Sequence, residues 1–309
     1  MSARSYSKRV ARRSWGQRLV ILIPYLWLAV FFLVPFLIVA KISLSQFATA
    51  QPPYLPQLDL AEGLDGLKAF FSELSFANYA RLVSDWLYLS SYGRSLIIAF
   101  ISTALLLALG LPIAYAMARA PRHWQGVLFM LIVLPFWTSF LIRVYAWMGL
   151  LAENGILNQV LRGTGLLADP GTILGTEWAV HLGIVYAYLP FMVLPLYVTL
   201  EKLDWSLLEA ASDLGARPLA AFLTVTLPLS LPGIVAGCLL VFIPAVGEFV
   251  IPDLLGGTRT LMIGKVLWDE FFTNADWPLA SAVAICLLVL LVGPIALFQR
   301  QQAKGLERQ

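Results

Sequence analysis

The stretch EAASDLGARPLAAFLTVTLP, Glu209 to Pro228, separates two long apolar segments of this 309-residue chain. Just before it, Ser206 stands three residues ahead of Glu209, a spacing that predicts a capping box at the start of a short helix. Gly215 predicts the end of that helix, and Pro218 predicts the first turn of a second one. We therefore expect two short helices that meet at an angle.

The first of these helices presents a short, narrow apolar stripe. Its members recur at helical spacing and are Leu207, Ala210, Ala211 and Leu214. Small side chains let the backbone of another protein approach closely, and the charges of Glu209, Asp213 and Arg217 could orient such a contact. A helix lying on the membrane surface is the alternative, but the stripe is short, lacks bulky aromatics before Phe222 and has few lysines. We predict that this surface docks a partner protein.

The composition indicates a polytopic membrane protein. Hydrophobic residues make up 60% of the chain and charged residues 13%, with a mean hydropathy of +0.80. Soluble domains contain about 45–50% apolar and roughly 25% charged residues. A membrane-spanning helix needs about 20 mostly apolar residues, so we predict an all-α bundle of six transmembrane helices. The predicted spans are residues 19–40, 94–118, 125–151, 178–200, 233–252 and 279–298.

The distribution of charge predicts the orientation of these spans. Residues 1–18 are rich in Arg and Lys and contain no acidic residue, whereas residues 41–93 are acidic on balance. Lys and Arg concentrate in loops that stay in the cytoplasm, so both termini and the Glu209 stretch are predicted to be cytoplasmic. The basic N-terminus suits anionic lipid, and nucleic-acid binding is not needed to explain it. The predicted parts are a cytoplasmic N-terminus (1–18), a first helix (19–40), a periplasmic segment (41–93), a five-helix core (94–298) that contains the cytoplasmic loop 201–232, and a cytoplasmic tail (299–309).

The sequence contains no nucleotide-binding or catalytic motif. The segment nearest to a P-loop, Gly264-Lys265-Val266, has Arg259 where that motif needs glycine and lacks the following Ser or Thr. His123 and His181 are predicted on opposite sides of the membrane, which excludes a shared metal site. A catalytic triad is excluded because no candidate histidine has a charged partner beside it. The two cysteines lie inside apolar segments, where we interpret them as packing residues. We predict that the chain is not an enzyme and holds no cofactor or metal of its own.

The spacing within the Glu209 stretch resembles the EAA cytoplasmic loop of the permease subunits of bacterial ABC importers. The shared pattern is Glu-Ala-Ala, three residues, Gly215, nine residues, a β-branched residue, one more residue, and Leu227-Pro228. Val225 is the β-branched residue here, where the family usually has isoleucine. The resemblance implies the type I ABC importer permease fold and a separate ATPase chain that binds ATP and Mg. The residues implied to couple to that ATPase are Glu209, Ala210, Ala211, Asp213, Gly215, Arg217, Leu227 and Pro228.

Longer stretches resemble the polyamine (putrescine and spermidine) branch of these permeases. They are PYLWLAVFFLVPFLIVAKISLS (24–45), LPFWTSFLIRVYAWMGLL (134–151), GIVYAYLPFMVLPLY (183–197) and FIPAVGEFVIPDLLGG (242–257). The resemblance implies import of a polyamine, putrescine first, across the bacterial inner membrane. The partners it implies are a cytoplasmic ABC ATPase dimer, a second homologous permease and a periplasmic solute-binding protein.

Other cargos and other transporter classes remain as alternatives. Related branches that share the loop motif import iron, thiamine or anions, so these solutes stay open within the importer class. A stand-alone channel or secondary transporter is the rival class, and it would move cargo without any ATPase. Within the polyamine branch, putrescine and spermidine both stay open as cargo, and the permease pair is either two different chains or two copies of this one.

Glu248 is the main candidate for the substrate pathway. It lies in the fifth predicted span about 15 residues beyond Gly233, hence roughly 22 Å along a helix that rises ~1.5 Å per residue. An ionisable group within a span usually faces the bundle interior or a cavity, and a carboxylate there could offset the charge of a diamine that leaves water. Pro244 and Gly247 predict an irregular backbone around it. The alternative is that Glu248 pairs with a cation of this subunit or its partner and only shapes the gate.

Aromatic residues and one arginine complete the candidates. Aromatic rings could line the passage and bind a cation for about 0.5–2 kcal/mol each, although Trp and Tyr are also enriched at membrane interfaces. Arg143, predicted near the outer end of the third span, would repel a diamine, so we expect it to form a salt bridge or to contact the external binding protein. The aromatic candidates are Trp137, Tyr145 and Tyr188, with Trp147 and Tyr186 beside them.

Overall fold

The computed structural model describes residues 15–57, 72–164, 173–258 and 260–306. These residues belong to two compact units, one made of Met1–Tyr79 with Asp276–Cys286 and the other of Ala80–Ala275 with Leu287–Gln309. Most of the predicted cytoplasmic segment 1–18 lies outside the described residues.

The first unit contains the N-terminal apolar helix. This helix runs from Trp15 to Ser43 through a single π-helical turn, and its part Leu19–Ser43 is long and apolar enough to cross a membrane. Asn78 donates hydrogen bonds to the backbone carbonyls of Ser43 (2.9 Å) and Ser45 (2.8 Å), which ties the end of the helix to the segment that follows. The elements of this region are α1 (Trp15–Leu28), η1 (Ala29–Leu33), α2 (Val34–Ser43), the antiparallel pair β1 (Gln46–Phe47) and β2 (Tyr54–Leu55), and α4 (Ala77–Ser84).

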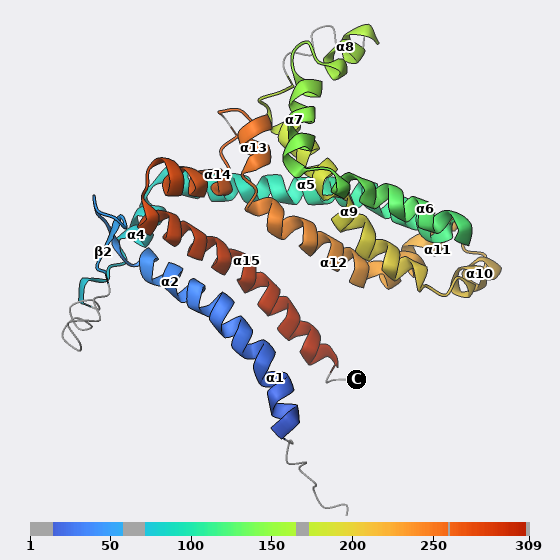
Figure 1. Cartoon of the computed structure of the whole chain (residues 1–309). Helices are drawn as coiled ribbons and strands as arrows, with labels where there is room; N and C mark the ends of the chain where they lie inside the picture. Colours follow the sequence, from blue (N-terminus) through green and yellow to red (C-terminus); the bar gives the residue numbers. More distant parts are fainter. Residues whose placement is uncertain (1–14, 58–71, 165–172, 259, 307–309) are drawn as a thin grey trace, which may run out of the picture. The chain divides into compact units, whose positions relative to one another are not determined.

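Three long helices form the centre of the second unit. α5 (Trp86–Arg119), α9 (Glu177–Glu201) and α12 (Leu227–Val246) pack against one another along their lengths (Figure 1). Small residues at their contacts let the helices approach closely. A Cβ atom added to Gly237 of α12 would lie only 3.1 Å from the backbone oxygen of Met192 in α9. The close contact of these helices therefore depends on glycine.

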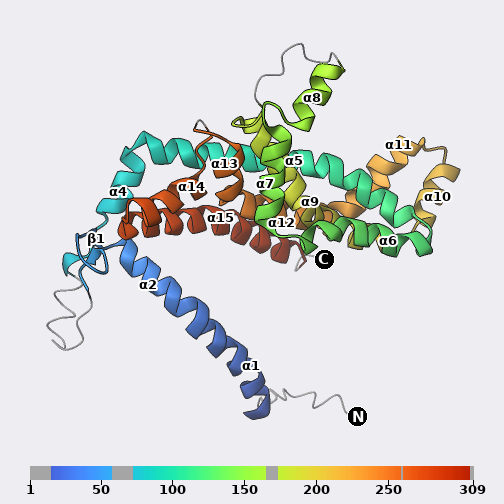
Figure 2. The same ribbon diagram turned by 45° about the horizontal axis from the view of Figure 1, so that its top comes forward.

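The third predicted span, 125–151, is wrong as one continuous helix. The structure divides it into α6 (Arg122–Val133), the 3₁₀ turn η2 (Leu134–Trp137) and α7 (Phe140–Leu151), followed by α8 (Ile156–Gly163). Pro135 opens the 3₁₀ turn and has no N–H with which to continue the α-helical ladder, and Thr138 then adopts an extended conformation. The break places α7 across the other helices rather than in line with α6 (Figure 2).

The fifth predicted span, 233–252, is also displaced. The helix begins earlier, since α11 (Pro218–Ala221), the π turn η3 (Phe222–Thr226) and α12 follow one another directly, and it ends at Val246. A separate short helix, α13 (Val250–Leu255), follows the break.

Five helices in the described part of the chain are long and apolar enough to span a membrane, and Trp277–Gly293 is a shorter apolar helix. The chain ends with α14 (Ile263–Trp268), η4 (Asp269–Thr273) and α15 (Trp277–Leu306), and α15 extends through the predicted sixth span into the predicted tail. The prediction of an all-α polytopic membrane protein is confirmed. The five helices long enough to span a membrane are Leu19–Ser43, Trp86–Arg119, Phe140–Gly163, Glu177–Glu201 and Pro218–Val246.

Candidate functional site

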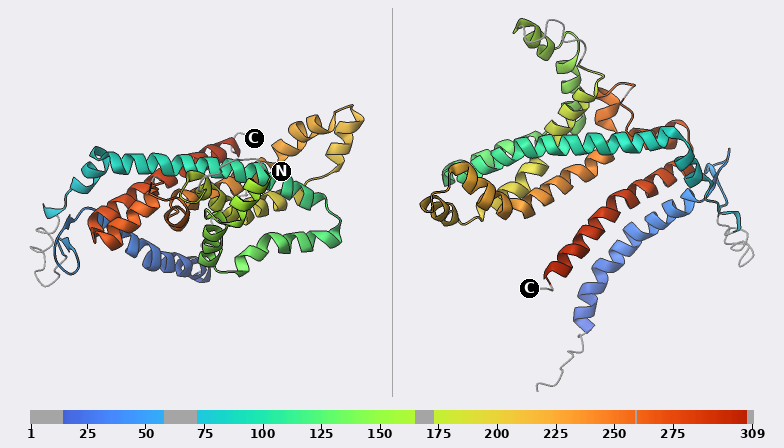
Figure 3. Two further views of the ribbon diagram at one scale, coloured as in Figure 1. Left: turned by 90° about the horizontal axis from the view of Figure 1, so that it is seen from above. Right: turned by 180° about the vertical axis from the view of Figure 1, so that it is seen from behind.

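The predicted docking surface is an elbow of two short helices at one end of the α5–α9–α12 group (Figure 3). We call residues 206–221, which form α10 (Ser206–Asp213) and α11, the α10–α11 elbow. Gly215 has φ +84°, its N–H donates to the Ser212 carbonyl (2.9 Å), and the N–H of Ala216 donates to the Ala211 carbonyl (3.0 Å). This pair of hydrogen bonds is the Schellman arrangement that ends a helix at glycine. The predicted helix end at Gly215 is confirmed.

The predicted capping box at Ser206 is wrong. Ser206 makes no side-chain capping bond, and instead its backbone N–H donates to the Asp204 carboxylate at 3.0 Å. The N-cap residue of α10 is Trp205, and the Asp204 carboxylate just before it accepts from the first helical N–H, where its negative charge suits the positive end of the helix dipole. The helix therefore begins slightly earlier than the sequence spacing suggested.

Most of the elbow is exposed on the described chain. Leu214 is 89% and Leu219 70% exposed, so large apolar side chains accompany the small ones that the sequence emphasised. Nothing lies within 4 Å of the position that a Cβ atom on Gly215 would occupy. The predicted coupling residues Glu209, Ala210, Asp213, Gly215, Arg217 and Pro228 are exposed, whereas Ala211 and Leu227 are half-buried.

An aromatic cluster that the sequence analysis missed fastens the elbow to α5. The ring of Tyr115 packs edge-on against Trp205 (centroids 5.9 Å apart) and against Phe222 (5.6 Å). Arg119 donates to the Tyr115 hydroxyl (3.1 Å), and its guanidinium lies 5.3 Å from the centroid of the Trp205 ring. Trp205 precedes α10 and Phe222 follows α11, so both ends of the elbow contact the same turn of α5. Movement of the elbow would therefore reach α5 as well as α12.

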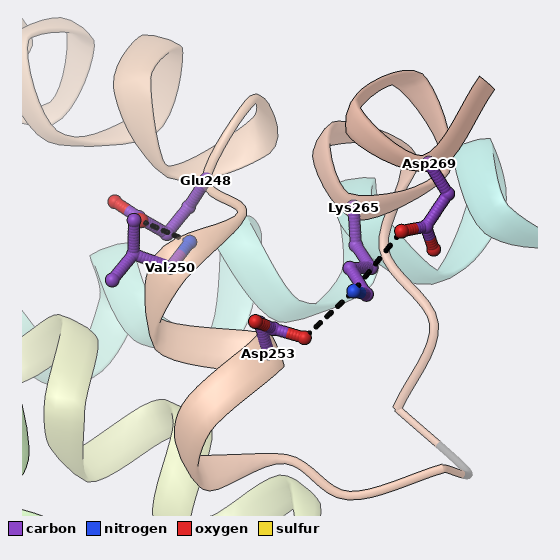
Figure 4. A network of polar contacts seen from close by, with 5 residues as sticks. All are labelled: Glu248, Val250, Asp253, Lys265 and Asp269. Carbon is purple, nitrogen blue, oxygen red and sulfur yellow. Dashed lines mark hydrogen bonds and ion pairs between the residues drawn. The ribbon is translucent and has the colours of Figure 1, made fainter. Parts of the chain in front are cut away.

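Glu248 lies at the break between α12 and α13, not inside a continuous helix as predicted. It is only 8% exposed. Its Oε1 accepts hydrogen bonds from the backbone N–H groups of Val250 (3.1 Å, Figure 4) and Ile251 (3.4 Å), and its Oε2 accepts from the Tyr188 hydroxyl at 2.5 Å. The carboxylate thus caps α13 while it faces α9. The irregular backbone that Pro244 and Gly247 predicted is present.

Glu248 opens onto a cavity of about 590 Å³. Tyr188 lines this cavity, whereas Trp137 (73% exposed) and Tyr145 (58% exposed) are not among its lining residues. Trp147 and Tyr186 instead pack edge-on against each other, with centroids 5.3 Å apart. Phenylalanines that the sequence could not distinguish from lipid-facing residues form much of the wall. The lining residues are Phe136, Phe140, Arg143, Ala187, Tyr188, Phe191, Pro244, Gly247, Glu248, Phe249 and Val250.

Arg143 also lines this cavity, which the sequence did not predict. Its Nη1 donates to the Pro135 carbonyl at 2.8 Å, and its guanidinium lies 5.7 Å and 5.8 Å from the ring centroids of Phe136 and Phe140. Within the described residues it forms no salt bridge, contrary to one of the two roles expected for it. The 3₁₀ break at Pro135 supplies both the carbonyl and the first ring.

An ionic network holds the helices that follow the break. Lys265 of α14 lies 2.7 Å from Asp253 of α13 and 3.1 Å from Asp269 (Figure 4). The hydrogen bond to Asp253 is the main reason why the pKa of Lys265 is raised above 10.5. Gly264 brings α14 against the backbone oxygens of Gly247 and Glu248. The position of Glu248 is thereby fixed from the α14 side.

We expect Gly264→Ala to disturb the Glu248 break. A Cβ atom at this position would lie 2.6 Å from the backbone oxygen of Glu248, and backbone cannot rotate away as a side chain does. Overpacking of this kind costs about 1–3 kcal/mol. The measurement is thermal unfolding of the purified complex, with Gly126→Ala as the control because nothing lies within 4 Å of that position. Equal unfolding temperatures for the two variants would contradict this close approach.

We expect the Lys265 network to stabilise the fold at neutral pH and to fail in strong alkali. Because the folded-state pKa of Lys265 is raised, its contribution is complete below 10.5 and is lost as the pH rises through the folded-state value. The contribution should be only about 0.5–1 kcal/mol, since all three side chains are partly exposed. Unfolding of wild type and Lys265→Met, compared at pH 8 and at a pH above the folded-state pKa of Lys265, checks this. A difference that persists in alkali would contradict it.

Comparison with known proteins places the chain in a family. Residues 95–307 match the family described as "Binding-protein-dependent transport system inner membrane component". The Haemophilus influenzae spermidine/putrescine transport system permease protein PotB is 42% identical over 92% of this chain and 93% of its own length. The Escherichia coli protein of the same name is 45% identical over 69% of this chain and 78% of its own length. The inner membrane ABC transporter permease protein YdcU of Escherichia coli is 30% identical over 92% of this chain and 89% of its own.

A solved structure confirms the predicted type I importer fold. The crystal structure of a bacterial ABC transporter involved in the import of the acidic polysaccharide alginate has a chain that matches with a TM-score of 0.69, covering 95% of this chain and 96% of its own. The sequences are only 16% identical, so this likeness concerns the fold alone. The prediction of a permease subunit rather than an enzyme is confirmed by the family and by the named relatives. The chain is a multi-pass inner-membrane protein and belongs to the family of binding-protein-dependent transport system inner membrane components.

Proposed function

We propose that this chain is the permease subunit of an ATP-driven importer of polyamines, with putrescine as the first candidate cargo. The observation that carries the proposal is the buried carboxylate of Glu248 at the wall of an aromatic cavity. The 42% identity to a permease named for spermidine and putrescine transport supports it.

The cavity offers the chemistry that a diamine needs. The Glu248 carboxylate pairs with no cation among the described residues, and it offsets the charge of one ammonium group that has left water. The rings of Phe136, Phe140 and Phe191 give apolar walls for the methylene chain, and Phe191 offers a cation–π contact of about 0.5–2 kcal/mol. A single carboxylate suits a short diamine, and the second ammonium group meets water or the partner permease.

The α10–α11 elbow is the surface that docks the ATPase. Its exposed leucines and the open space around Gly215 suit a partner that approaches closely. The complete machine contains two permease subunits, a cytoplasmic ATPase dimer that binds ATP and Mg, and a periplasmic solute-binding protein. Both termini of this chain and its elbow are cytoplasmic. ATP drives transport because the ATPase has different affinities for ATP in the two states of the permease, which shifts their populations.

Import of a small anion is the second candidate, because Arg143 lines the same cavity as Glu248. A guanidinium group is well suited to carboxylate and phosphate-like cargo. The capped carboxylate then has only a structural role at the start of α13.

Uptake by the reconstituted complex tests the proposal. Proteoliposomes that contain both permeases and the ATPase, with binding protein outside, should accumulate labelled putrescine and spermidine when ATP is inside. Iron and small anions serve as the competing cargos. Accumulation of one of these without polyamine uptake would overturn the polyamine assignment and leave the importer assignment intact.

A further inference from the structure

One cation in the cavity has no role in the function proposed above. Among the described residues, Arg143 and Glu248 are the only charged ones that line the 590 Å³ space, and they come from different elements, α7 and the α12–α13 break. A guanidinium group beside a polyamine site repels the cargo. Its presence there requires a reason.

The partners of Arg143 are weak ones for a charged group. Its Nη1 donates to a neutral acceptor, the carbonyl oxygen of Pro135. Its guanidinium group lies near two phenylalanine rings. Its Nε is buried and has no hydrogen-bond partner among the described residues. Arginine carries five N–H donors and remains charged in proteins, so an unmatched buried donor is costly. Among the described residues no carboxylate forms an ion pair with Arg143, although Glu248 lines the same cavity.

The Glu248 carboxylate has no cationic partner among the described residues. Its oxygens accept from two backbone amides and one tyrosine, all of them neutral donors, and it forms no ion pair among the described residues. Two opposite charges are therefore held apart within one cavity. Closure of that cavity would expel water, and two buried charges left unpaired would then cost several kcal/mol.

We propose that Arg143 is a built-in exchange cation, which pairs with Glu248 when the cavity closes without cargo and competes with the cargo ammonium for that carboxylate. The inference rests on the proposed cation-import function. When cargo is bound, Arg143 keeps the contacts that this structure shows for it, namely the Pro135 carbonyl and the two phenylalanine rings. When the cargo must leave, Arg143 replaces it on Glu248, and its attachment to α7 gives it a high effective concentration there. A cargo without positive charge does not displace Arg143.

Cargo affinity gives the first test. Equilibrium binding of labelled putrescine is measured on the nucleotide-free permease–ATPase complex in nanodiscs, without binding protein. Arg143→Met removes the competing charge, so it should bind putrescine about tenfold more tightly, release it more slowly and transport it with a lower maximal rate. Arg143→Lys keeps the charge and should resemble the wild type. Unchanged or weaker binding by Arg143→Met would overturn the proposal, because a purely structural arginine predicts that result.

Cross-linking gives a second test that uses no cargo. Arg143→Cys and Glu248→Cys are combined after the native Cys238 and Cys286 have been replaced, and a flexible bifunctional thiol reagent is added. The cross-link should form in one of the nucleotide-free and vanadate-trapped states and be strongly reduced in the other. The control pair is Trp137→Cys with Glu248→Cys, because Trp137 does not line the cavity. Equal yields in both states, or none in either, would contradict the exchange.

The two tests separate this inference from the proposed function. If the wild-type complex binds no putrescine or spermidine, the polyamine assignment fails, and the state dependence of the cross-link still decides whether positions 143 and 248 approach each other when the cavity closes. If putrescine binds to the wild type but Arg143→Met does not bind it more tightly, the exchange role fails and the polyamine assignment remains.

Discussion

Replacing Glu248 by glutamine will lower polyamine uptake by the assembled complex about tenfold or more. Glutamine has nearly the same shape and retains an oxygen that can accept from the amides of Val250 and Ile251, so the start of α13 is preserved. The negative charge is lost. A hydrogen bond to a charged group contributes about 1.5–3 kcal/mol, which corresponds to a factor of about ten to a hundred in affinity or rate. Uptake of labelled putrescine into proteoliposomes measures the effect.

Two matched variants show whether charge or local structure is responsible. Glu248→Asp keeps the charge at a shorter reach, and Tyr188→Phe removes one hydrogen bond of 2.5 Å without changing the charge. Both should transport better than Glu248→Gln, and all three should assemble with the ATPase. Wild-type uptake by Glu248→Gln would show that the carboxylate serves only as a helix cap.

Replacing Gly215 by valine will separate the permease from its ATPase. Two effects combine at this position, because φ is +84° and the space above the glycine is open on the described chain. A β-branched residue is a genuine outlier at positive φ, and a left-handed residue other than glycine costs about 1–2 kcal/mol. The side chain would also project from the exposed elbow. We expect normal insertion and pairing with the second permease, but loss of ATPase co-purification and of uptake.

The control for Gly215 is another exposed glycine with the same backbone strain. Gly175 has φ +85° and likewise nothing within 4 Å of its Cβ position, but it lies before α9 and outside the elbow. Gly175→Val should therefore retain the ATPase. Gly215→Asn, which tolerates positive φ, should fall between wild type and Gly215→Val. Full ATPase binding and uptake by Gly215→Val would rule out the elbow as the docking surface.

The sequence predicted the features that depend on local chemistry. The helix end at Gly215 and the start of α11 at Pro218 each depend on a residue with special backbone requirements, and the structure has both. The break at Pro135 could not be predicted in the same way, because Pro112 and Pro190 remain inside uninterrupted helices. Whether a proline breaks or only bends a membrane helix depends on neighbouring helices that supply partners for the freed backbone groups.

In the candidate cavity, too, some residues could be predicted from local chemistry and others depend on how the helices pack. Glu248 could be selected from the sequence because an ionisable group in an apolar run is costly wherever it lies. The sequence predicts Arg143 at the outer end of a continuous helix, and only the break at η2 brings it to the cavity that Glu248 lines. Phe136, Phe140 and Phe191 carry no sequence signal that separates a cavity wall from a lipid-facing surface. Only the packing of the helices places these three rings in the cavity wall.

The most direct test of the central claim, that a separate ATPase drives this permease through the α10–α11 elbow, is the dependence of accumulation on that ATPase. Labelled putrescine is offered to proteoliposomes that contain both permeases with and without the ATPase, with ATP inside and binding protein outside. We predict accumulation above the external concentration only when the ATPase is present and ATP can be hydrolysed. Accumulation against the gradient by the permeases alone would contradict the claim.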